Sequence, residues 1–285
     1  MAIQWFPGHM TKARREFAES IGVNDLIIEV LDARMPRASE NPIVTELRGQ
    51  KPCLKVLTKS DLADPEITKK WLRYFETERA EVSKRYPEGN VRAVALRTDK
   101  PNEAKKLVPE LAKKLAPHRV GPGKAVRAVV AGIPNVGKST LINTLMGRKV
   151  TKVADKPAVT KSRQHVTLEN GMTLWDNPGI MWPNLTDTGG SIRLALGGAI
   201  PDSAIEYENV ALFAAKYFLE HYPQLIVARY KLEAPPETAH ALLEEIGRRR
   251  GGLRPGGVID LHKAADVLIH EFRAGTIGRI SLEEP

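Results

Sequence analysis

The sequence predicts an α/β domain with a mostly parallel β-sheet, covered by helices on both faces and followed by a small all-helical domain. The first observation is a set of short apolar runs separated by stretches with helical spacing, which is typical of parallel strands joined by helices. These runs are residues 26–31, 53–57, 91–96, 126–131 and 172–175. The second observation is that after about residue 202 the strand signal weakens and helical apolar stripes replace it.

Helices are expected before and between the first strands. Charged residues 11–20 favour a short helix with few core contacts. Asp64 or a neighbour is expected to cap a helix that continues to residue 79, and Asn102 one that continues to residue 115. The sequence therefore alternates helices and strands, as a sheet covered on both faces requires.

The Asn170-Gly171 pair is a strong signal for a two-residue hairpin turn, here between residues 165–168 and 172–175. One antiparallel hairpin is therefore expected in the otherwise parallel sheet. The expected division of the chain is an N-terminal arm or helix (1–20), an α/β domain (21–187) and a basic helical domain (188–285).

The composition indicates which kind of partner the protein binds and in which cellular compartment it works. The chain has 285 residues, with 43 Lys and Arg against 34 Asp and Glu, for a formal net charge of +9. Such a surplus can simply keep a surface soluble, but it also favours a polyanionic partner such as RNA. Cys53 is the only cysteine, so no intramolecular disulfide can form and a reducing compartment is expected. No stretch is apolar enough for a membrane span or a signal peptide, which predicts a cytoplasmic protein.

A phosphate-binding loop is predicted where the run 126–131 ends. Residues 132–139 read Gly-Ile-Pro-Asn-Val-Gly-Lys-Ser and match G-x-x-x-x-G-K-[ST], with a helical run after them. In such a loop, backbone N–H groups and a helix N-terminus surround phosphates, the lysine reaches the β- and γ-phosphates, and the serine hydroxyl binds Mg²⁺. The predicted nucleotide contacts here are Asn135, Val136, Gly137, Lys138, Ser139 and Thr140.

Two further segments would complete the phosphate and metal site. Asp176 begins a D-x-P-G sequence at the end of a strand, where its carboxylate can hold Mg²⁺ and the N–H of Gly179 can contact the γ-phosphate. Thr160 lies in the polar loop between the two motifs, where its hydroxyl can join the metal shell. Taken alone, D-x-P-G is a common turn and Thr160 an ordinary loop residue; their position after the phosphate loop favours the functional interpretation.

A guanine-reading segment is predicted at residues 58–61, after the run 53–57. An N-K-x-D sequence at the carboxyl end of a strand reads guanine, because the aspartate accepts hydrogen bonds from the ring N1–H and the exocyclic amine. Lys59 and Asp61 fit this pattern, whereas Thr58 replaces the asparagine and can supply only one of its contacts. The fifth nucleotide loop is expected around residues 95–97.

Together these motifs resemble the ribosome biogenesis GTPase A family, also called YlqF. The likeness also covers three shorter segments: residues 5–10 (Trp-Phe-Pro-Gly-His-Met), 32–36 (Asp-Ala-Arg-Met-Pro) and 273–279. It implies a circularly permuted Ras-like P-loop GTPase domain followed by a helical domain, and slow GTP hydrolysis during late assembly of the large ribosomal subunit. The sequence departs from the family at Thr58 and at Ala158, where Asn and Gly are usual.

The resemblance also suggests catalytic details. Ile180 stands where many GTPases have a water-positioning glutamine, so another group must orient the water, and His9 is the candidate that the family suggests. The alternative is a partly exposed histidine in an N-terminal arm. Asn135 resembles the asparagine of K⁺-stimulated GTPases, although a loop asparagine with a local backbone bond is an equal alternative.

RNA contacts are predicted for the arginines of a glycine-rich loop at residues 247–254, with Arg34 and Arg37 on the same face. The loop arginines are Arg248, Arg249, Arg250 and Arg254. Lysines of the expected helix 102–115 are interpreted as a solvated face. The expected partner is the large ribosomal subunit with its rRNA, recognised by shape and backbone, with no DNA or membrane partner.

Two other functions remain open at this stage. One is an enzyme that uses ATP with relaxed base choice, for which Thr58 is the supporting feature. The other is an RNA-binding module with a vestigial nucleotide site, against which the intact Lys138, Ser139 and Asp176 argue.

Overall fold

The computed structural model describes residues 9–78, 90–150, 164–177, 179, 181, 188–254 and 256–285. Its centre is a six-stranded sheet in the order β3-β2-β1-β4-β6-β5. The strands are β1 (Leu26–Asp32), β2 (Cys53–Thr58), β3 (Val91–Ala95), β4 (Arg127–Ala131), β5 (Gln164–Thr167) and β6 (Thr173–Asp176). All neighbouring strands are parallel except β5 and β6, which form the predicted hairpin. The α/β fold with one antiparallel hairpin is therefore confirmed.

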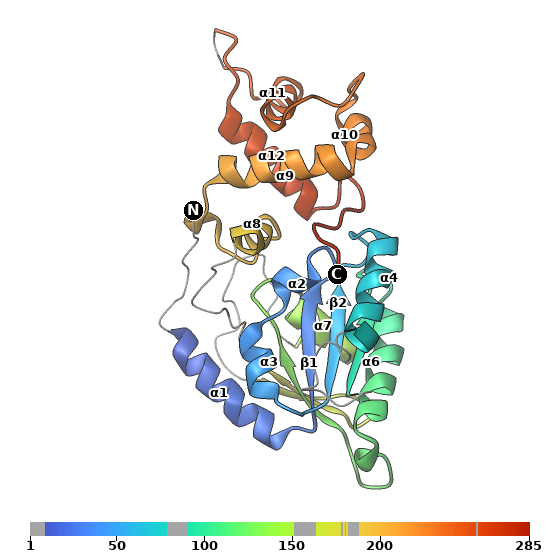
Figure 1. Cartoon of the computed structure of the whole chain (residues 1–285). Helices are drawn as coiled ribbons and strands as arrows, with labels where there is room; N and C mark the ends of the chain where they lie inside the picture. The colour runs from blue at the N-terminus through green and yellow to red at the C-terminus, as the bar shows by residue number, and fades with distance from the viewer. Residues whose placement is uncertain are drawn as a thin grey trace.

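Helices cover both faces of this sheet, because successive strand residues point to opposite sides. On one face, the side chains of Ile28 and Leu54 pack against α6 (Pro101–Leu115) and α7 (Lys138–Met146). On the other face, Ile27 and Cys53 pack against α1 (His9–Val23) and α3 (Pro42–Arg48), and Leu31 packs near α4 (Pro65–Arg73). The short helix α2 (Pro36–Ser39) follows β1. Figure 1 shows α1, α3 and α6 flanking the strands.

Three sequence predictions about helices need correction or refinement. Helix α1 does contact the core, because Phe17 and Ile21 lie four residues apart on one face of a charged helix and are both buried. Asp64 caps α4 as predicted, accepting from the N–H groups of the next turn, but after Arg73 the chain continues as a π-helical turn, Tyr74–Glu78. Helix α6 begins at Pro101, because proline suits the first helical position, and its cap is Lys100 rather than Asn102.

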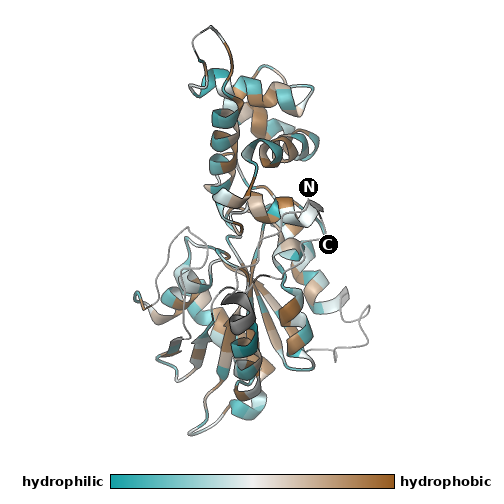
Figure 2. Ribbon diagram, turned by 90° about the vertical axis from the view of Figure 1, so that its left-hand side faces the viewer, coloured by the Kyte–Doolittle hydropathy of each residue, from teal (hydrophilic) through white to brown (hydrophobic). Residues whose placement is uncertain are grey.

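The second part of the chain is helical, as predicted. It contains α8 (Thr188–Leu196), a short 3-10 turn (Asp202–Ala204), α9 (Tyr207–His221), α10 (Pro223–Tyr230), α11 (Ala239–Arg249) and α12 (Leu261–Arg273). Another 3-10 turn, Pro117–Arg119, follows α6 in the first part. Helix α9 packs against α11 and α12, while α8 contacts α2 of the first part. In Figure 1 these helices form an upper lobe, with α8 at the junction to the lower lobe. In Figure 2 the strands of the lower lobe are largely brown, the colour of hydrophobic residues.

Candidate functional site

The predicted motifs meet at the carboxyl edge of the sheet. Strands β1, β2, β4 and β6 are neighbours or near neighbours, and all four point the same way. Their last residues are Asp32, Thr58, Ala131 and Asp176. The sequence-adjacent strand β2 lies on one side of β1 and β4 lies on the other, so the winding reverses here. Ligands of open α/β sheets bind at such a reversal.

The phosphate loop connects β4 to α7, as its motif predicts. Lys138 is the first residue of α7 and is buried, and its Nζ donates to the carbonyl of Ile133 at 2.7 Å. Gly137 caps the helix with a φ of 101°, a left-handed conformation that glycine adopts without strain. Ser139 and Thr140 lie in the first turn of α7, where backbone N–H groups lack helical partners. The loop therefore has the geometry of an anion site.

Asp176 faces the same place and has no hydrogen-bond partner among the described residues. Its side chain is fully buried, and neither carboxylate oxygen has a hydrogen bond there. Burial raises the pKa of Asp176 to about 6, although Lys138 opposes the shift, and burial lowers the pKa of Lys138 to about 8. The described residues contain no group of three or more His, Cys, Asp or Glu that could hold a metal by themselves. A single buried carboxylate close to the lysine of a phosphate loop fits Mg²⁺ that completes its shell with phosphate and water.

Gly179 connects the D-N-P-G segment to the phosphate loop. A Cβ added at Gly179 would lie 2.8 Å from the backbone nitrogen of Pro134 and 3.1 Å from Nζ of Lys138. Only glycine permits this approach, so the two motifs are in direct contact. Thr160, the remaining predicted metal ligand, lies outside the described residues.

Thr58 contacts the phosphate loop directly. Its Oγ1 lies 2.6 Å from the carbonyl oxygen of Val136 and 2.9 Å from that of Leu31, and its single hydroxyl hydrogen can be donated to either. The threonine thus joins the end of β2 to the phosphate loop with its short side chain. Its hydroxyl is used within the protein.

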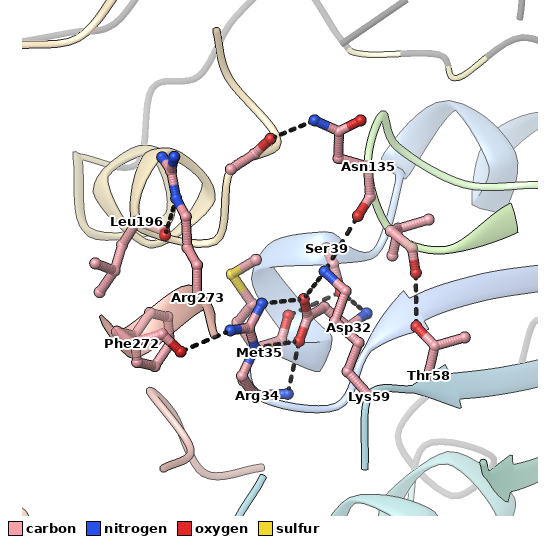
Figure 3. Close-up of polar contacts among 12 residues, drawn as sticks. Asp32, Arg34, Met35, Ser39, Thr58, Lys59, Asn135, Leu196, Phe272 and Arg273 are labelled. Atoms are coloured by element: carbon pink, nitrogen blue, oxygen red, sulfur yellow. Dashed lines mark hydrogen bonds and ion pairs between the residues drawn. The ribbon is translucent and has the colours of Figure 1, made fainter. Parts of the chain in front are cut away.

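Lys59 connects the end of β1 to the phosphate loop. Its Nζ donates to Oδ2 of Asp32 at 2.9 Å and to the carbonyl of Asn135 at 3.1 Å (Figure 3). Its φ of 56° is unusual for a residue with a side chain. The predicted guanine box and the predicted phosphate loop are therefore joined by two adjacent side chains, those of Thr58 and Lys59.

Asp32 and Arg34 belong to this site, although no sequence motif gave them a role there. Arg34 forms a bidentate ion pair with Asp32, through Nε at 2.9 Å and Nη2 at 2.8 Å, and both side chains are almost completely buried. Burial alone would raise the pKa of Asp32, but the charges of Arg34 and Lys59 outweigh it and hold that pKa well below its usual range. The signal available in the sequence was an aspartate at the carboxyl end of a strand.

Asp61 is oriented by the loop that follows β3. Its Oδ1 accepts the backbone N–H of Thr98 at 2.9 Å, and the N–H of Ser60 donates to the carbonyl of Leu96 at 3.2 Å. The loop predicted around residues 95–97 to be the fifth nucleotide loop therefore lies against the guanine box.

Comparison with known proteins agrees with this geometry. The family described as 50S ribosome-binding GTPase matches residues 127–216, which begin at β4 and include the phosphate loop and D-N-P-G. The chain is 41% identical to ribosome biogenesis GTPase A of Bacillus cereus, over 100% of this chain and 95% of that protein. It is 31% identical to ribosome biogenesis GTPase A of Thermotoga maritima, over 99% and 95%. The chain belongs to the ribosome biogenesis GTPase A family.

Solved structures of this family extend the match to the whole fold. The GDP-bound structure of TM YlqF aligns with a TM-score of 0.67 and 28% identity, over 95% of this chain and 99% of that one. GNP-bound YlqF from T. maritima aligns with a TM-score of 0.65 and 28% identity, over 96% and 98%. The protein is a circularly permuted GTPase of this family and its ligand is a guanine nucleotide. The 50S ribosome-binding GTPase match starts at β4 because in the permuted order the guanine box precedes it.

Asn135, which resembles the asparagine of K⁺-stimulated GTPases, contacts the helical part. Its Nδ2 donates to the carbonyl of Gly198, just after α8, at 2.8 Å. Its φ of 57° places it in the left-handed region that asparagine tolerates better than most residues. No contact of the described residues tests a K⁺ role for Asn135, and that role stays a prediction.

His9, the family's candidate for water positioning, is the first residue of α1, and the structure describes its backbone but not its side chain. Helix α1 approaches the D-N-P-G segment at its other end. There Oγ of the buried Ser20 lies 3.5 Å from Oδ1 of Asn177, which follows Asp176. The helix that carries His9 therefore touches the segment next to the predicted metal ligand.

The four arginines predicted to bind RNA are all engaged with acidic side chains. Arg248 and Arg249 belong to the last turn of α11 rather than to a loop, because the helical pattern runs through them, and both pair with Glu245. Arg250 lies 3.4 Å from Glu271, and Arg254 pairs with Asp260 at 2.7 Å.

RNA binding by these arginines stays a prediction, but two related expectations are wrong. Arg34 cannot join a basic face, because it is buried against Asp32 and the ring of Phe272. Residues 188–285 are not basic, since they contain 11 Lys and Arg against 13 Asp and Glu. The positive surplus lies in residues 1–187, with 32 Lys and Arg against 21 Asp and Glu.

In the described residues, no helix is both long and apolar enough to cross a bilayer.

Proposed function

We propose that this GTPase is an assembly factor that binds the precursor of the large ribosomal subunit, acts in its late maturation in the cytoplasm, and hydrolyses GTP faster on that particle. The supporting observation is that the guanine box, the phosphate loop and D-N-P-G meet at one sheet edge in a chain similar throughout to ribosome biogenesis GTPase A. The contact between Asn135 and Gly198 gives the helical part a direct connection to the nucleotide loop.

Sedimentation with large-subunit particles tests this proposal. We expect co-sedimentation with a non-hydrolysable GTP analogue, less with GDP, and less again with Asp61→Ala, which should weaken guanine binding. GTP turnover should rise when particles are added. Equal sedimentation in all nucleotide states, together with unchanged turnover, would contradict the proposal.

The proposed nucleotide contacts follow the motifs. Residues 135–140 and Gly179 surround the phosphates, and Thr58, Lys59 and Asp61 serve the base. The proposed Mg²⁺ ligands are Ser139, Asp176 and Thr160. The buried carboxylate of Asp176, without a partner among the described residues, supports the metal. When bound, Mg²⁺ neutralises phosphate charge, while Lys138 stabilises the developing charge and is the proposed catalytic lysine.

Water positioning is assigned to His9, because Ile180 can neither donate nor accept a hydrogen bond with its side chain. The His9→Ala variant should keep its affinity for GDP and lose particle-stimulated turnover. Rates measured with and without particles check this, and unchanged stimulated turnover would remove His9 from the mechanism. Comparing rates in K⁺ and Na⁺ tests the monovalent ion at Asn135 in the same assay.

RNA binding through Arg248, Arg249, Arg250 and Arg254 requires phosphates to compete with the acidic partners. Lysines on α6 offer a comparison, because Lys105, Lys106 and Lys113 are exposed and form no ion pair with a described residue. Replacing either set by alanine should reduce the salt dependence of particle binding in proportion to the number of phosphates that the set neutralises. An unchanged slope for the arginine set would exclude it as the RNA surface.

A nucleotide-dependent enzyme with relaxed base choice is the second candidate, favoured only by Thr58. Competition of GTP and ATP for a fluorescent guanine nucleotide separates the two. Equal competition would favour the second candidate.

A further inference from the structure

The segment that follows α12 returns to the guanine box and packs on it. We call residues 275–284 the strap. Ile280 and Leu282 in this segment are fully buried. In Figure 1 the C-terminus lies beside the end of β2 and α4, far from the outer helices of its own lobe.

The strap forms hydrogen bonds with the loop that contains Asp61. The N–H of Ile280 donates to the carbonyl of Leu62 at 3.0 Å, and the N–H of Asp64 donates to Oγ of Ser281 at 3.2 Å. These contacts lie one and three residues after Asp61. A Cβ added to Gly275 would lie 2.5 Å from Cδ2 of Leu62, so the strap also fits closely against that side chain.

The helical part holds the strap in place from the other side. The hydroxyl of Tyr222, between α9 and α10, donates to the carbonyl of Ser281 and accepts the N–H of the same residue, both at 3.1 Å. Leu282 donates its N–H to the carbonyl of Arg34 at 2.6 Å, and its own carbonyl accepts from Nε of Arg193 at 2.9 Å. Ser281 therefore connects Tyr222 to the guanine-reading loop.

We propose that the strap is a positioning element of the guanine site, which holds residues 61–64 in the conformation that reads the base. The strap does not contact the phosphate loop through any described hydrogen bond, so its effect should be confined to the base. Residues of the helical part thereby influence which nucleotide is bound and how tightly. This inference rests on the proposed reading of guanine by Asp61.

The affinity ratio of GDP to inosine diphosphate (IDP) tests the inference. Inosine lacks the exocyclic amine, so the ratio reports the contact between that amine and Asp61. The Ser281→Ala and Tyr222→Phe variants should each lower the ratio about threefold to tenfold, the size of one hydrogen bond. Their affinity for pyrophosphate should stay that of the unmodified protein. The matched control is Glu284→Gln, which alters the strap only at its exposed pair with Lys70 and should leave the ratio unchanged.

The Asp61→Ala variant separates the two possible failures. If Asp61→Ala lowers the ratio while Ser281→Ala and Tyr222→Phe leave it unchanged, the strap inference is overturned and the proposed guanine reading stands. If Asp61→Ala itself leaves the ratio unchanged, the guanine reading fails and the strap inference fails with it.

Amide hydrogen exchange supplies a reciprocal test, because coupling between two sites acts in both directions. GDP should slow exchange at the amides of Ile280 and Leu282 more than IDP does, when both are added at saturation. Equal protection by the two nucleotides would contradict the inference.

Discussion

The two ends of the nucleotide site are built in different ways. At the phosphate end, nearly every group comes from residues 132–139 and from Asp176 to Gly179, and the buried carboxylate of Asp176 has no partner among the described residues. At the guanine end, polar groups from separate segments pair with each other: Asp32 pairs with Arg34 and Lys59, and Asp61 accepts the N–H of Thr98. The phosphate end thus has polar groups in position for a ligand, whereas the guanine end is held by contacts within the protein.

This difference indicates where a substitution should affect stability and where it should affect chemistry. Groups that already bind each other contribute to the free energy of unfolding, and their loss leaves a buried charge without a partner. Groups without partners contribute only when nucleotide and metal arrive. Three variants test this division, in decreasing order of expected effect.

The Asp32→Asn variant should lose about 3–5 kcal/mol of unfolding free energy, because Arg34 would stay buried without an opposite charge. Denaturant unfolding of the nucleotide-free protein measures this. The control is Asp99→Asn, which breaks an exposed pair with Arg97 near the same edge and should leave the unfolding free energy close to that of the unmodified protein. A small loss of unfolding free energy in Asp32→Asn would show that the ion pair of Asp32 and Arg34 does not stabilise the guanine end.

The same variant has a predicted pH dependence. Because the pKa of Asp32 is lower in the folded chain than in the unfolded one, its contribution to stability is complete above the unfolded value of 3.8 and is lost as the pH falls further. The difference between the unmodified protein and Asp32→Asn should therefore shrink below about pH 4. A difference in unfolding free energy that does not depend on pH would show that Asp32 is not ionised in the folded protein.

The Lys138→Ala variant should lower the rate of GTP hydrolysis about 10²–10³-fold, the usual effect of removing one group that stabilises transition-state charge. This variant should lose much less unfolding free energy than Asp32→Asn does, because burying the charged side chain of Lys138 is itself unfavourable. Single-turnover rates and denaturant unfolding, measured on one preparation, give both quantities. A variant that hydrolyses normally would exclude Lys138 from catalysis.

The Thr58→Val variant should weaken GDP binding about fivefold, the effect of about 1 kcal/mol from one hydrogen bond. Valine keeps the shape and removes the hydroxyl that joins β2 to the carbonyl of Val136. Thr58→Asn, which introduces the residue usual in the family, is the comparison. Equal affinity of the valine variant and the unmodified protein would show that this hydroxyl does not position the phosphate loop.

Sequence patterns predicted those parts of the molecule that depend on neighbouring residues. The strands, the hairpin at Asn170 and the turn around Gly137 follow from local periodicity and backbone preference, and the structure has each of them. Contacts between distant segments leave no such pattern, so the pairing of Asp32 with Lys59 and the contact of Asn135 with Gly198 were not foreseen.

The basic character assigned to residues 188–285 failed for a different reason: the arginines were counted without the acidic residues of the same segment. Four closely spaced arginines suggested a charged surface, but Glu245 on the preceding turn of the same helix and Glu271 from α12 pair with three of them. The number of basic residues in a segment does not give the charge that its surface presents.

The packing of Ser281 against Asp64 also bears on how the chain folds, since it closes a loop of 217 residues. Contacts this far apart in sequence form late, because chain entropy opposes them until most of the structure is in place. The turn between β4 and α7 needs only a short stretch of chain. If refolding is followed residue by residue, the phosphate loop should therefore form early. The contacts between the strap and the guanine box should form in the last kinetic phase.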